Sequence, residues 1–512
     1  MRFASARPQT FLDGGRPLTQ LRLALTSAGF ELGESRSVRR TLLDTFDGRL
    51  ADAGLRLEHR EGDRSGLVLD DDRSSAAELP GAQPPRFAAD LPVGPFRARL
   101  GAATAGRALL PQRAVAAMAT PVVRRNRDAK TVAAATIYEA PASDGRPTDA
   151  VWVVEVDALT GYDSATARLR AVLDDLDLAS ADGDVFELAG PIVAPGRASA
   201  SPTIALDPAA PADEGFRAVL LHLAATLQLN LPGTIDDIDS EFLHELRVAV
   251  RRTRSVLSHA TGVLPADDVA AGRREFAWLG EITGPARDLD VYQLEWADYL
   301  RGLAPATSAA LEVVRAHLDE QRRDAHVRLA AELRSPRTDE LLAWWRGWLS
   351  PTAGSAPTIT PTMTTTSDHV GRRIRKAHRR LVTGGRAIDA DSPTEAVHDL
   401  RKDAKRLRYL LECFGGLYGA KSRRAVVDRL KALQDNLGGH QDADVHGRHL
   451  RELTAELAGR LPVETVIAAG QLVEQLEQRR AAMRAMFAQR FAEFDSAATR
   501  SALRALLATV DR

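Results

Sequence analysis

Hydrophobic residues recur at two different spacings along the chain, and the change of spacing divides it into two halves. Before residue 195, short runs alternate between apolar and polar positions and are separated by turn residues, as β-strands are. After residue 212, apolar residues recur every three to four positions over long stretches, which indicates amphipathic helices. The sequence therefore predicts an α+β, mainly antiparallel first half and an all-α second half.

The expected elements follow from these runs. In the first half we expect strands at 37–44, 54–60, 65–69, 132–139 and 151–158, and helices at 18–28 and 164–176. In the second half we expect helices at 214–228, 240–257, 271–282, 288–300, 308–334, 339–348, 368–381, 393–413, 423–437, 442–458, 462–494 and 501–510. Gly438 and Gly439 follow one of these helices and predict its C-cap.

Stretches rich in Pro, Ala, Ser and Thr mark the boundaries between the expected domains. They predict a first domain at 1–195, a linker at 196–212 and a second domain at 213–512. The second domain is expected to contain two units, 213–349 and 368–512, joined by a loop at 350–367.

An internal repeat accounts for these two units. Leu243–Arg254 and Val397–Arg408 lie 154 residues apart and share the order His, acid, Leu, Arg and then basic pairs. The register continues without a gap, since Leu279, Gly284, Asp288, Asp290 and Val291 align with Leu433, Gly438, Asp442, Asp444 and Val445. A repeat of this length predicts a duplicated helical unit. We expect the repeated aspartates to pair with the basic helices or to cap helix N-termini.

Helical geometry brings the repeated cations together. At 100° per residue, His244, Arg247, Arg251 and Arg254 fall within about 80° of one another, and His398, Arg401, Lys405 and Arg408 share a face in the same way. Two such helices packed around a pseudo-twofold axis would place cations around one cleft, where only an anion relieves their repulsion. The alternative is a pair of solvated helix faces whose cations pair with nearby carboxylates.

The net charge of −1 hides a local excess of positive charge. Residues 371–431 contain 17 Lys and Arg against 7 Asp and Glu, which predicts contact with a polyanion. Only Tyr409, Phe414 and Tyr418 supply aromatic rings in this stretch, so a bare phosphate chain fits it better than the bases of a nucleic acid.

Other features limit the class of protein. The single cysteine, Cys413, allows no internal disulfide and predicts a reducing compartment. We expect a cytoplasmic protein without a membrane span, because no apolar run reaches about 18 residues. Neither a phosphate-binding glycine loop nor a Cys/His cluster with zinc spacing occurs, so we expect no cofactor. The oligomeric state stays open.

The second half resembles the CHAD domain, a helical domain named for its histidines. The resemblance rests on the duplicated His-acid-Leu-Arg helices and on the Asp-x-Asp-Val pieces at Asp288–Val291 and Asp442–Val445. It implies paired helical bundles around a basic groove that binds inorganic polyphosphate, with possible targeting to polyphosphate granules. The residues expected to contact polyphosphate are His244, Arg247, Arg251, Arg252, Arg254, Arg372, Arg373, Arg375, Lys376, Arg379, His398, Arg401, Lys402, Lys405, Arg406, Arg408, Lys421, Arg424 and Lys431.

The first half resembles the CYTH domain, which has the triphosphate tunnel fold, so the resemblance implies a β-tunnel-like domain. Residues 39–60 resemble the family's Tyr-Phe-Asp-Thr segment and its following Gly-Leu-x-Leu-Arg-x-Arg strand, but Leu42 and Leu43 replace aromatics and Glu58 replaces an Arg. The residues expected in the tunnel are Arg39, Arg56, Glu58, Arg60, Arg125, Arg127, Glu155 and Asp157.

One further departure from the CYTH pattern bears on catalysis. Catalytic members begin with a Glu-x-Glu-x-Lys strand whose carboxylates hold divalent metals, and residues 1–20 contain no such strand. We therefore expect a degenerate CYTH-like domain and a non-enzymatic polyphosphate-binding protein with no metal site. The alternative hypothesis is a Mg²⁺- or Mn²⁺-dependent triphosphatase or polyphosphatase to which the CHAD domain delivers substrate.

Overall fold

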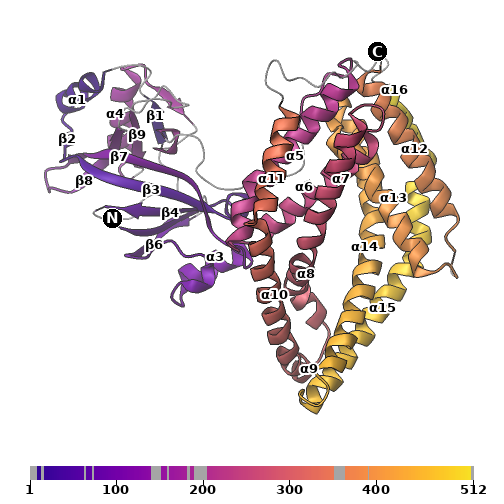
Figure 1. Ribbon diagram of the computed structural model, residues 1–512. Coiled ribbons are helices and arrows are strands. Elements are labelled where there is room, and N and C mark those ends of the chain that lie inside the picture. Colours follow the sequence, from indigo (N-terminus) through magenta and orange to yellow (C-terminus); the bar gives the residue numbers. More distant parts are fainter. Residues whose placement is uncertain are drawn as a thin grey trace. The chain divides into compact units, whose positions relative to one another are not determined.

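The chain forms two compact units, Met1–Arg197 and Ala198–Arg512, in the computed structural model (Figure 1). The structure describes residues 9–12, 17–62, 65–71, 74–139, 152–157, 159, 161–181, 185–188, 204–350, 364–389 and 391–508. Residues 196–203 of the expected linker and most of the loop between the repeats therefore lie outside the described residues.

The first unit is built on an antiparallel sheet. Its strands are β1 (Gln9–Leu12), β2 (Glu31–Leu32), β3 (Arg36–Asp44), β4 (Leu55–Glu61), β5 (Gly66–Asp71), β6 (Ser74–Pro80), β7 (Leu110–Arg125), β8 (Thr131–Glu139), β9 (Trp152–Asp157) and β10 (Ala179–Ala181). Within the described residues the strands pair in the order β10-β1-β9-β8-β7-β3-β4-β5-β6, and β2 pairs with β7. The predicted α+β, antiparallel architecture of this half is confirmed.

Helices cover this sheet with two apolar clusters. The first cluster joins α1 (Leu18–Ser27) and α4 (Asp163–Asp174) to β8 and β9, with Leu25, Ile137 and Leu169 fully buried. The second joins α2 (Arg49–Asp52) and α3 (Pro95–Thr104) to β4 and β5. The expected strands and helices of this half all occur, whereas β1, β2, β6, β10, α2 and α3 were not predicted. Of β7, the resemblance to the CYTH domain covers only the end, within 123–127.

The second unit is all-helical, as predicted, within its described residues. Its α-helices are α5 (Ala212–Ile235), α6 (Ser240–His259), α7 (Ala266–Ile282), α8 (Gly284–Leu300), α9 (Pro305–Ala310), α10 (Glu312–Leu333), α11 (Pro336–Leu349), α12 (Thr366–Arg386), α13 (Thr394–Cys413), α14 (Ala420–Glu456), α15 (Val463–Phe494) and α16 (Ala497–Ala508). One large core includes residues of α5, α6, α7, α12, α13 and α14, and contains the buried Cys413.

The two repeats meet across a pseudo-twofold axis. A residue near such an axis contacts the equivalent residue of the other repeat. Two pairs of residues that are 154 positions apart make such contacts. Pro211 forms a β-bridge with Thr365. The Tyr292 hydroxyl donates a 3.0 Å hydrogen bond to the carbonyl oxygen of His446. A second core, which joins α8, α9 and α10 to α14 and α15, surrounds the latter contact, and Figure 1 shows these helices meeting at α9.

The repeats differ in the helix that follows the repeated cationic helix, and the prediction of a break there in the second repeat was wrong. The helices expected at 423–437 and 442–458 form the single helix α14, which continues through Gly438 and Gly439. In the first repeat the same stretch is divided into α7 and α8 at Thr283. Pro285, the equivalent of Gly439, lacks the N–H that a continuous helix needs, whereas Gly439 keeps it. The aspartates of α14 therefore lie inside a helix and do not cap one.

Among the described residues, α5 is the one helix long and apolar enough to cross a membrane. Its residues Phe216, Val219 and Leu223 are fully buried in the core of the helical unit. The hydropathy of α5 is therefore explained by packing within the protein.

Candidate functional site: a cationic pocket between the repeats

A pocket of about 1030 Å³ lies between the two repeats of the helical unit. It is lined by side chains of α6, α8 and α10 from the first repeat and of α13 and α14 from the second. The lining residues are His244, Arg247, Arg251, Pro285, Arg287, Asp288, Leu289, Val291, Tyr292, Gln321, Asp324, Ala325, Arg328, His398, Arg401, Lys405, Gln441, Asp442, Val445, His446, Arg448, His449 and Glu452. The lining contains seven Lys or Arg side chains and four carboxylates.

Three pairs of equivalent residues bring the repeated motif into this pocket. His244 and His398, Arg247 and Arg401, and Arg251 and Lys405 all line it. Their helices bury Leu246, Val250, Leu400 and Leu407 on the neighbouring face, so the core fixes the direction of the cations. The charge of Arg251 also acts on Lys405, which places these two equivalent side chains near each other across the axis.

The two central arginines have different hydrogen-bond partners, but equivalent glycines lie beside them. Nη1 of Arg247 donates hydrogen bonds to the carbonyl oxygen of Gly280 at 3.1 Å and to Oγ1 of Thr283 at 3.0 Å. Nη2 of Arg401 lies 3.4 Å from Oδ1 of Asp442. A Cβ atom at Gly284 would stand 3.7 Å from Arg247, and one at Gly438 would stand 3.8 Å from Arg401. The repeated glycines therefore mark where each arginine crosses the neighbouring helix.

The cations of the pocket destabilise one another's charged forms. Burial, together with the charges of Arg401 and Arg251, lowers the pKa of Lys405 to about 7. Burial and the charge of Arg251 lower the pKa of Arg247 to about 10. Burial raises the pKa of Asp288 and of Asp442, although the facing arginines act in the opposite direction. Positive charge is therefore held here at a cost that a bound anion would remove.

A buried hydrogen-bond network forms the floor of the pocket near the axis. The Tyr299 hydroxyl donates to Oε2 of Glu295 at 2.6 Å and accepts from Nδ1 of His446. His446 lines the pocket and is 5% exposed, and burial lowers its pKa to about 4. On the opposite side, Nδ1 of His398 bonds Oε1 of Gln441 at 2.9 Å. Both imidazoles are thus fixed in orientation by groups on another helix or another repeat.

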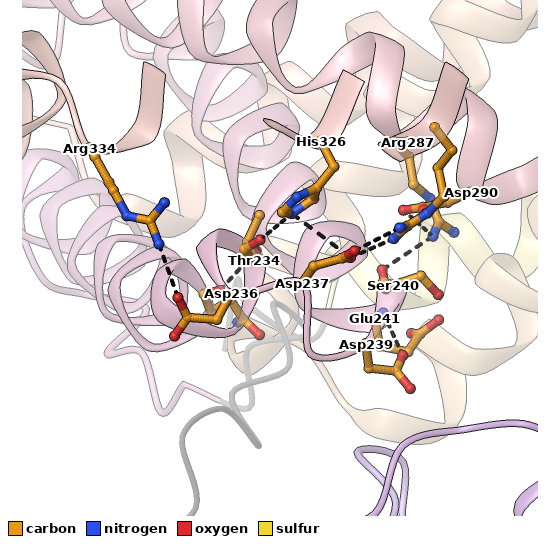
Figure 2. Close-up of polar contacts among 12 residues, drawn as sticks. Thr234, Asp236, Asp237, Asp239, Ser240, Glu241, Arg287, Asp290, His326 and Arg334 are labelled. Atoms are coloured by element: carbon orange, nitrogen blue, oxygen red, sulfur yellow. Dashed lines mark hydrogen bonds and ion pairs between the residues drawn. The ribbon is translucent and has the colours of Figure 1, made fainter. Parts of the chain in front are cut away.

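An ionic network fixes the helices of the first repeat (Figure 2). Arg322 of α10 contacts Asp290 of α8 at 2.7 Å and Asp237, in the turn between α5 and α6, at 2.5 and 2.7 Å. Asp237 has a φ of 50°, a left-handed conformation that Arg322 helps to hold. Nη1 of Arg287 also bonds the carbonyl oxygen of Ser240 at the start of α6. These contacts tie together three helices that line the pocket.

The structure distributes the predicted polyphosphate residues over several places. Six line the pocket: His244, Arg247, Arg251, His398, Arg401 and Lys405. Four more pair with carboxylates, as Arg252 and Arg408 do with Glu412, Lys402 with Asp399 and Arg406 with Asp403. The others lie on α6, α12 and α14 outside the lining: Arg254, Arg372, Arg373, Arg375, Lys376, Arg379, Lys421, Arg424 and Lys431.

The pocket also contains cations that the sequence analysis missed, namely Arg287, Arg328 and Arg448. Arg287 and its equivalent Gln441 each stand directly before a repeated aspartate, so the alignment of the repeats could have predicted that Arg287 lies near the pocket. Arg328 and Arg448 have no such signal, because only the packing of α10 and α14 brings them to the pocket.

The interior of the β unit holds a second charged cluster, but there the charges are neutralised. Arg40 of β3 donates to Glu58 at 2.8–3.0 Å and to Glu155 at 2.7 Å. All three side chains are at most 6% exposed. Nε of Arg56 and Nε of Arg60 also contact Glu58, at 2.7 and 3.1 Å. The charges of Arg40, Arg60 and Arg56 lower the pKa of Glu58 well below its usual value despite its burial, so it stays ionised as part of an ion network.

The network spans several strands of the sheet. Two strands, β8 and β7, separate Glu155 on β9 from Arg40 on β3, and a flat sheet would place those strands about 14 Å apart. The direct contact indicates that the sheet curls around the network. Burial and the charge of Glu155 raise the pKa of the neighbouring Asp157 to about 6.

The remaining tunnel candidates lie elsewhere. Arg39 is exposed on the opposite face of β3, Arg125 pairs with Glu31 and Arg127 is exposed in the turn after β7. Arg40, which the sequence analysis missed, shares a face with Glu58 because it is paired with Arg60. Within the described residues, no group of three or more His, Cys, Asp or Glu side chains is arranged to hold a metal.

Comparison with known proteins assigns the helical unit. The family model of the CHAD domain matches residues 218–451. The chain contains a CHAD domain. The CHAD domain of the plant Ricinus communis, known from a crystal structure, is 30% identical, and the match covers 60% of this chain and 96% of that one with a TM-score of 0.45. The matched range contains both copies of the repeated helix.

Other proteins resemble parts of the chain. An uncharacterised protein of Mycobacterium tuberculosis strain H37Rv is 30% identical over 269 residues, which is 49% of this chain and 48% of that protein. The chain thus spans about half the length of the curated relatives that it matches. A Hippeastrum protein described as an adenylyl cyclase with a dominant triphosphatase activity is 15% identical, with 36% of this chain and 93% of that chain covered and a TM-score of 0.25. That likeness is too low to assign the β unit to a family.

Proposed function

We propose that this protein binds inorganic polyphosphate in the pocket between the two repeats of its CHAD domain. The observation that carries the proposal is the convergence of the repeated cations, with Arg247, Arg251, Arg401 and Lys405 lining one pocket. Guanidinium groups contact phosphate oxygens in pairs, and a lysine ammonium adds a point charge. A chain of phosphates offers many such oxygens at close spacing, so it suits a pocket with contacts from both repeats.

The composition of the pocket favours phosphate over nucleic acid. Tyr292 is the only ring of Phe, Tyr or Trp among the described lining residues, and its hydroxyl bonds the backbone of the opposite repeat. Single-stranded nucleic acids are bound largely by stacking of bases on aromatic rings, for which this lining offers little. The proposal extends to a cytoplasmic protein located at polyphosphate granules.

We also propose that the β unit is non-catalytic. A metal-dependent triphosphatase needs carboxylates free to bind a divalent cation. Glu58 and Glu155 are instead bound by Arg40, and Glu155 also accepts a 2.9 Å hydrogen bond from the backbone of Val185. These contacts support a structural role for the interior carboxylates. Hydrolysis by a CYTH-like domain stays the alternative hypothesis.

One experiment tests both parts of the proposal. Binding of long-chain polyphosphate is measured at near-physiological salt, with DNA as competitor, and phosphate release is followed in the same samples with Mg²⁺ or Mn²⁺. We expect tight binding that DNA does not displace, without phosphate release. Absence of binding would overturn the proposed function of the pocket. Metal-dependent phosphate release would favour the hydrolase hypothesis.

A further inference from the structure

One face of α12 carries a row of four exposed cations. Arg372, Arg375, Lys376 and Arg379 are exposed and fall within about 100° of one another around the helix. Among the residues that the structure describes, none of the four makes a hydrogen bond or an ion pair. None lines the pocket either. We call these four residues the α12 stripe.

Three exposed arginines of the first repeat pair with carboxylates instead. Arg301 pairs with Asp298 at 2.5 Å, and Arg334 and Arg337 each pair with a carboxylate at 3.1 Å. An ordinary solvated helix face contains carboxylates among its cations, as these pairs do. Residues 369–388, which include the stripe, contain no Asp or Glu at all.

The groups beside the stripe add to its positive charge. Arg373 of the same helix donates to the carbonyl oxygen of Thr261 at 3.0 Å and to His369 at 3.2 Å. Burial, with the charges of Arg373 and Arg406 next in effect, lowers the pKa of His259 to about 4. The ends of α6 and α12 thus meet in a region of positive potential that is separate from the pocket.

The first repeat has no such stripe. The equivalents of Arg372, Arg375, Lys376 and Arg379, 154 positions earlier on α5, are Ala218, Leu221, His222 and Ala225. The duplication therefore keeps the pocket cations of the repeated helix in both copies, as Arg247 and Arg251 and as Arg401 and Lys405, but places a cationic outer face in one copy only. A solubility role alone would not require four like charges to gather on one helix.

We propose that the α12 stripe is a second contact for inorganic polyphosphate, which engages the part of a long chain that the pocket does not hold. This inference rests on the proposed function of the pocket. The pocket has a volume of about 1030 Å³, so a long polymer must extend beyond it. The stripe spans about 10 Å along the helix and presents its charges to solvent as a short track.

The chemistry of α12 disfavours other partners. A helix that lies on a membrane needs an apolar face to insert, but Val370, Ile374 and Leu381 of α12 are fully buried in the core. The helix contains no Phe, Tyr or Trp, so it offers no platform for stacked bases.

The test compares two ligands and two matched variants of the full chain. The stripe variant combines Arg372→Gln, Arg375→Gln, Lys376→Gln and Arg379→Gln. The control variant combines Arg301→Gln, Arg323→Gln, Arg334→Gln and Arg337→Gln, which removes the same charge from exposed positions of the first repeat. Affinities for tripolyphosphate and for long-chain polyphosphate are measured over a salt series, with circular dichroism to verify folding.

We expect all three proteins to bind tripolyphosphate equally, because this ligand reaches only the pocket. For the long chain, the stripe variant should bind about ten- to a hundredfold more weakly, and the slope of log K against log salt should fall by up to about 3. Equal long-chain affinity of the stripe and control variants would overturn the inference. If the unmodified protein bound neither phosphate ligand, the proposed function itself would fail.

Discussion

The two units of this protein each gather charged side chains around an interior, but they balance the charges in opposite ways. In the β unit, Arg40 is matched by Glu58 and Glu155, and the cluster is almost completely buried. In the helical unit, seven cations face four carboxylates in a pocket of about 1030 Å³. A balanced buried network serves the fold, whereas an excess of cations around an open pocket is stable only at a cost and suits an anionic ligand.

The strongest test of the proposed role of the pocket is to reverse the charges of Arg251 and Lys405. We expect Arg251→Glu combined with Lys405→Glu to weaken polyphosphate binding about 100- to 10,000-fold, since each lost charged contact is worth about 1.5–3 kcal/mol. Isothermal titration calorimetry measures this change. The matched control, Lys421→Glu with Lys431→Glu, makes the same change of charge on exposed positions of α14 outside the pocket. Equal losses in the two variants would show that the pocket has no special role.

The β-unit side is tested by removing one member of the balanced network. Arg40→Ala leaves Glu58 and Glu155 buried without their shared partner, so we expect the free energy of unfolding of the β unit to fall by about 3–5 kcal/mol. Hydrogen exchange of the β4 amides measures it. Arg39→Ala, one residue away on the exposed face, should change stability by less than about 0.5 kcal/mol. An equally small effect of Arg40→Ala would show that the network does not stabilise the β unit.

The pH dependence of binding sharpens the comparison further. The pKa of Lys405 is lowered to about 7 in the free protein, and a bound phosphate raises it again. Below pH 7 the ammonium is already charged, whereas above pH 7 binding must take up a proton. Affinity should therefore fall by up to about tenfold per pH unit above 7.

Lys405→Arg isolates this effect, because an arginine stays charged and restores the residue of the first repeat. We expect the variant to bind with a flatter pH profile between pH 7.5 and 9.5, and to release less buffer-dependent heat in calorimetry. Identical profiles for the variant and the unmodified protein would exclude Lys405 as the source of the pH dependence.

The smallest expected effect concerns the carboxylates of the two clusters. Asp288→Asn or Asp442→Asn removes a negative charge from the pocket, and we expect each to strengthen polyphosphate binding about threefold. Glu58→Gln in the β unit should instead destabilise that unit, because three arginines lose their shared partner. Weaker binding by both asparagine variants would mean that these aspartates orient Arg247 and Arg401 more than they oppose the ligand.

Local pattern was sufficient for much of the fold. Helical periodicity predicted nearly all helices of the second half, and the repeat predicted which of their faces are alike. The sequence prediction failed at Gly438 and Gly439. Glycine often ends a helix, but α14 continues through both residues. The prediction also missed all but the end of β7, a 16-residue strand whose alanines and prolines carry little strand signal.

The residues of the candidate site were likewise only partly predictable from the sequence. The repeat identified His244, Arg247, Arg251 and their equivalents from sequence, since they share one helix face. It could not separate them from Arg252 or Lys402, which ion pairs with Glu412 and Asp399 engage. In the β unit, the choice between Arg39 and Arg40 depended on the pairing of β3 with β4. Pairing across strands is a long-range property that alternation within one strand does not contain.

The sequence by itself determined the two-part organisation, the duplication and the cationic face of each repeated helix, because helical period and internal repetition are local properties of the chain. Only the tertiary structure decided that Arg251 and Lys405 line one pocket, that Arg328 and Arg448 join them, and that Arg40 neutralises Glu58 and Glu155. Those outcomes depend on how distant segments pack, and packing is set by the shape of whole cores.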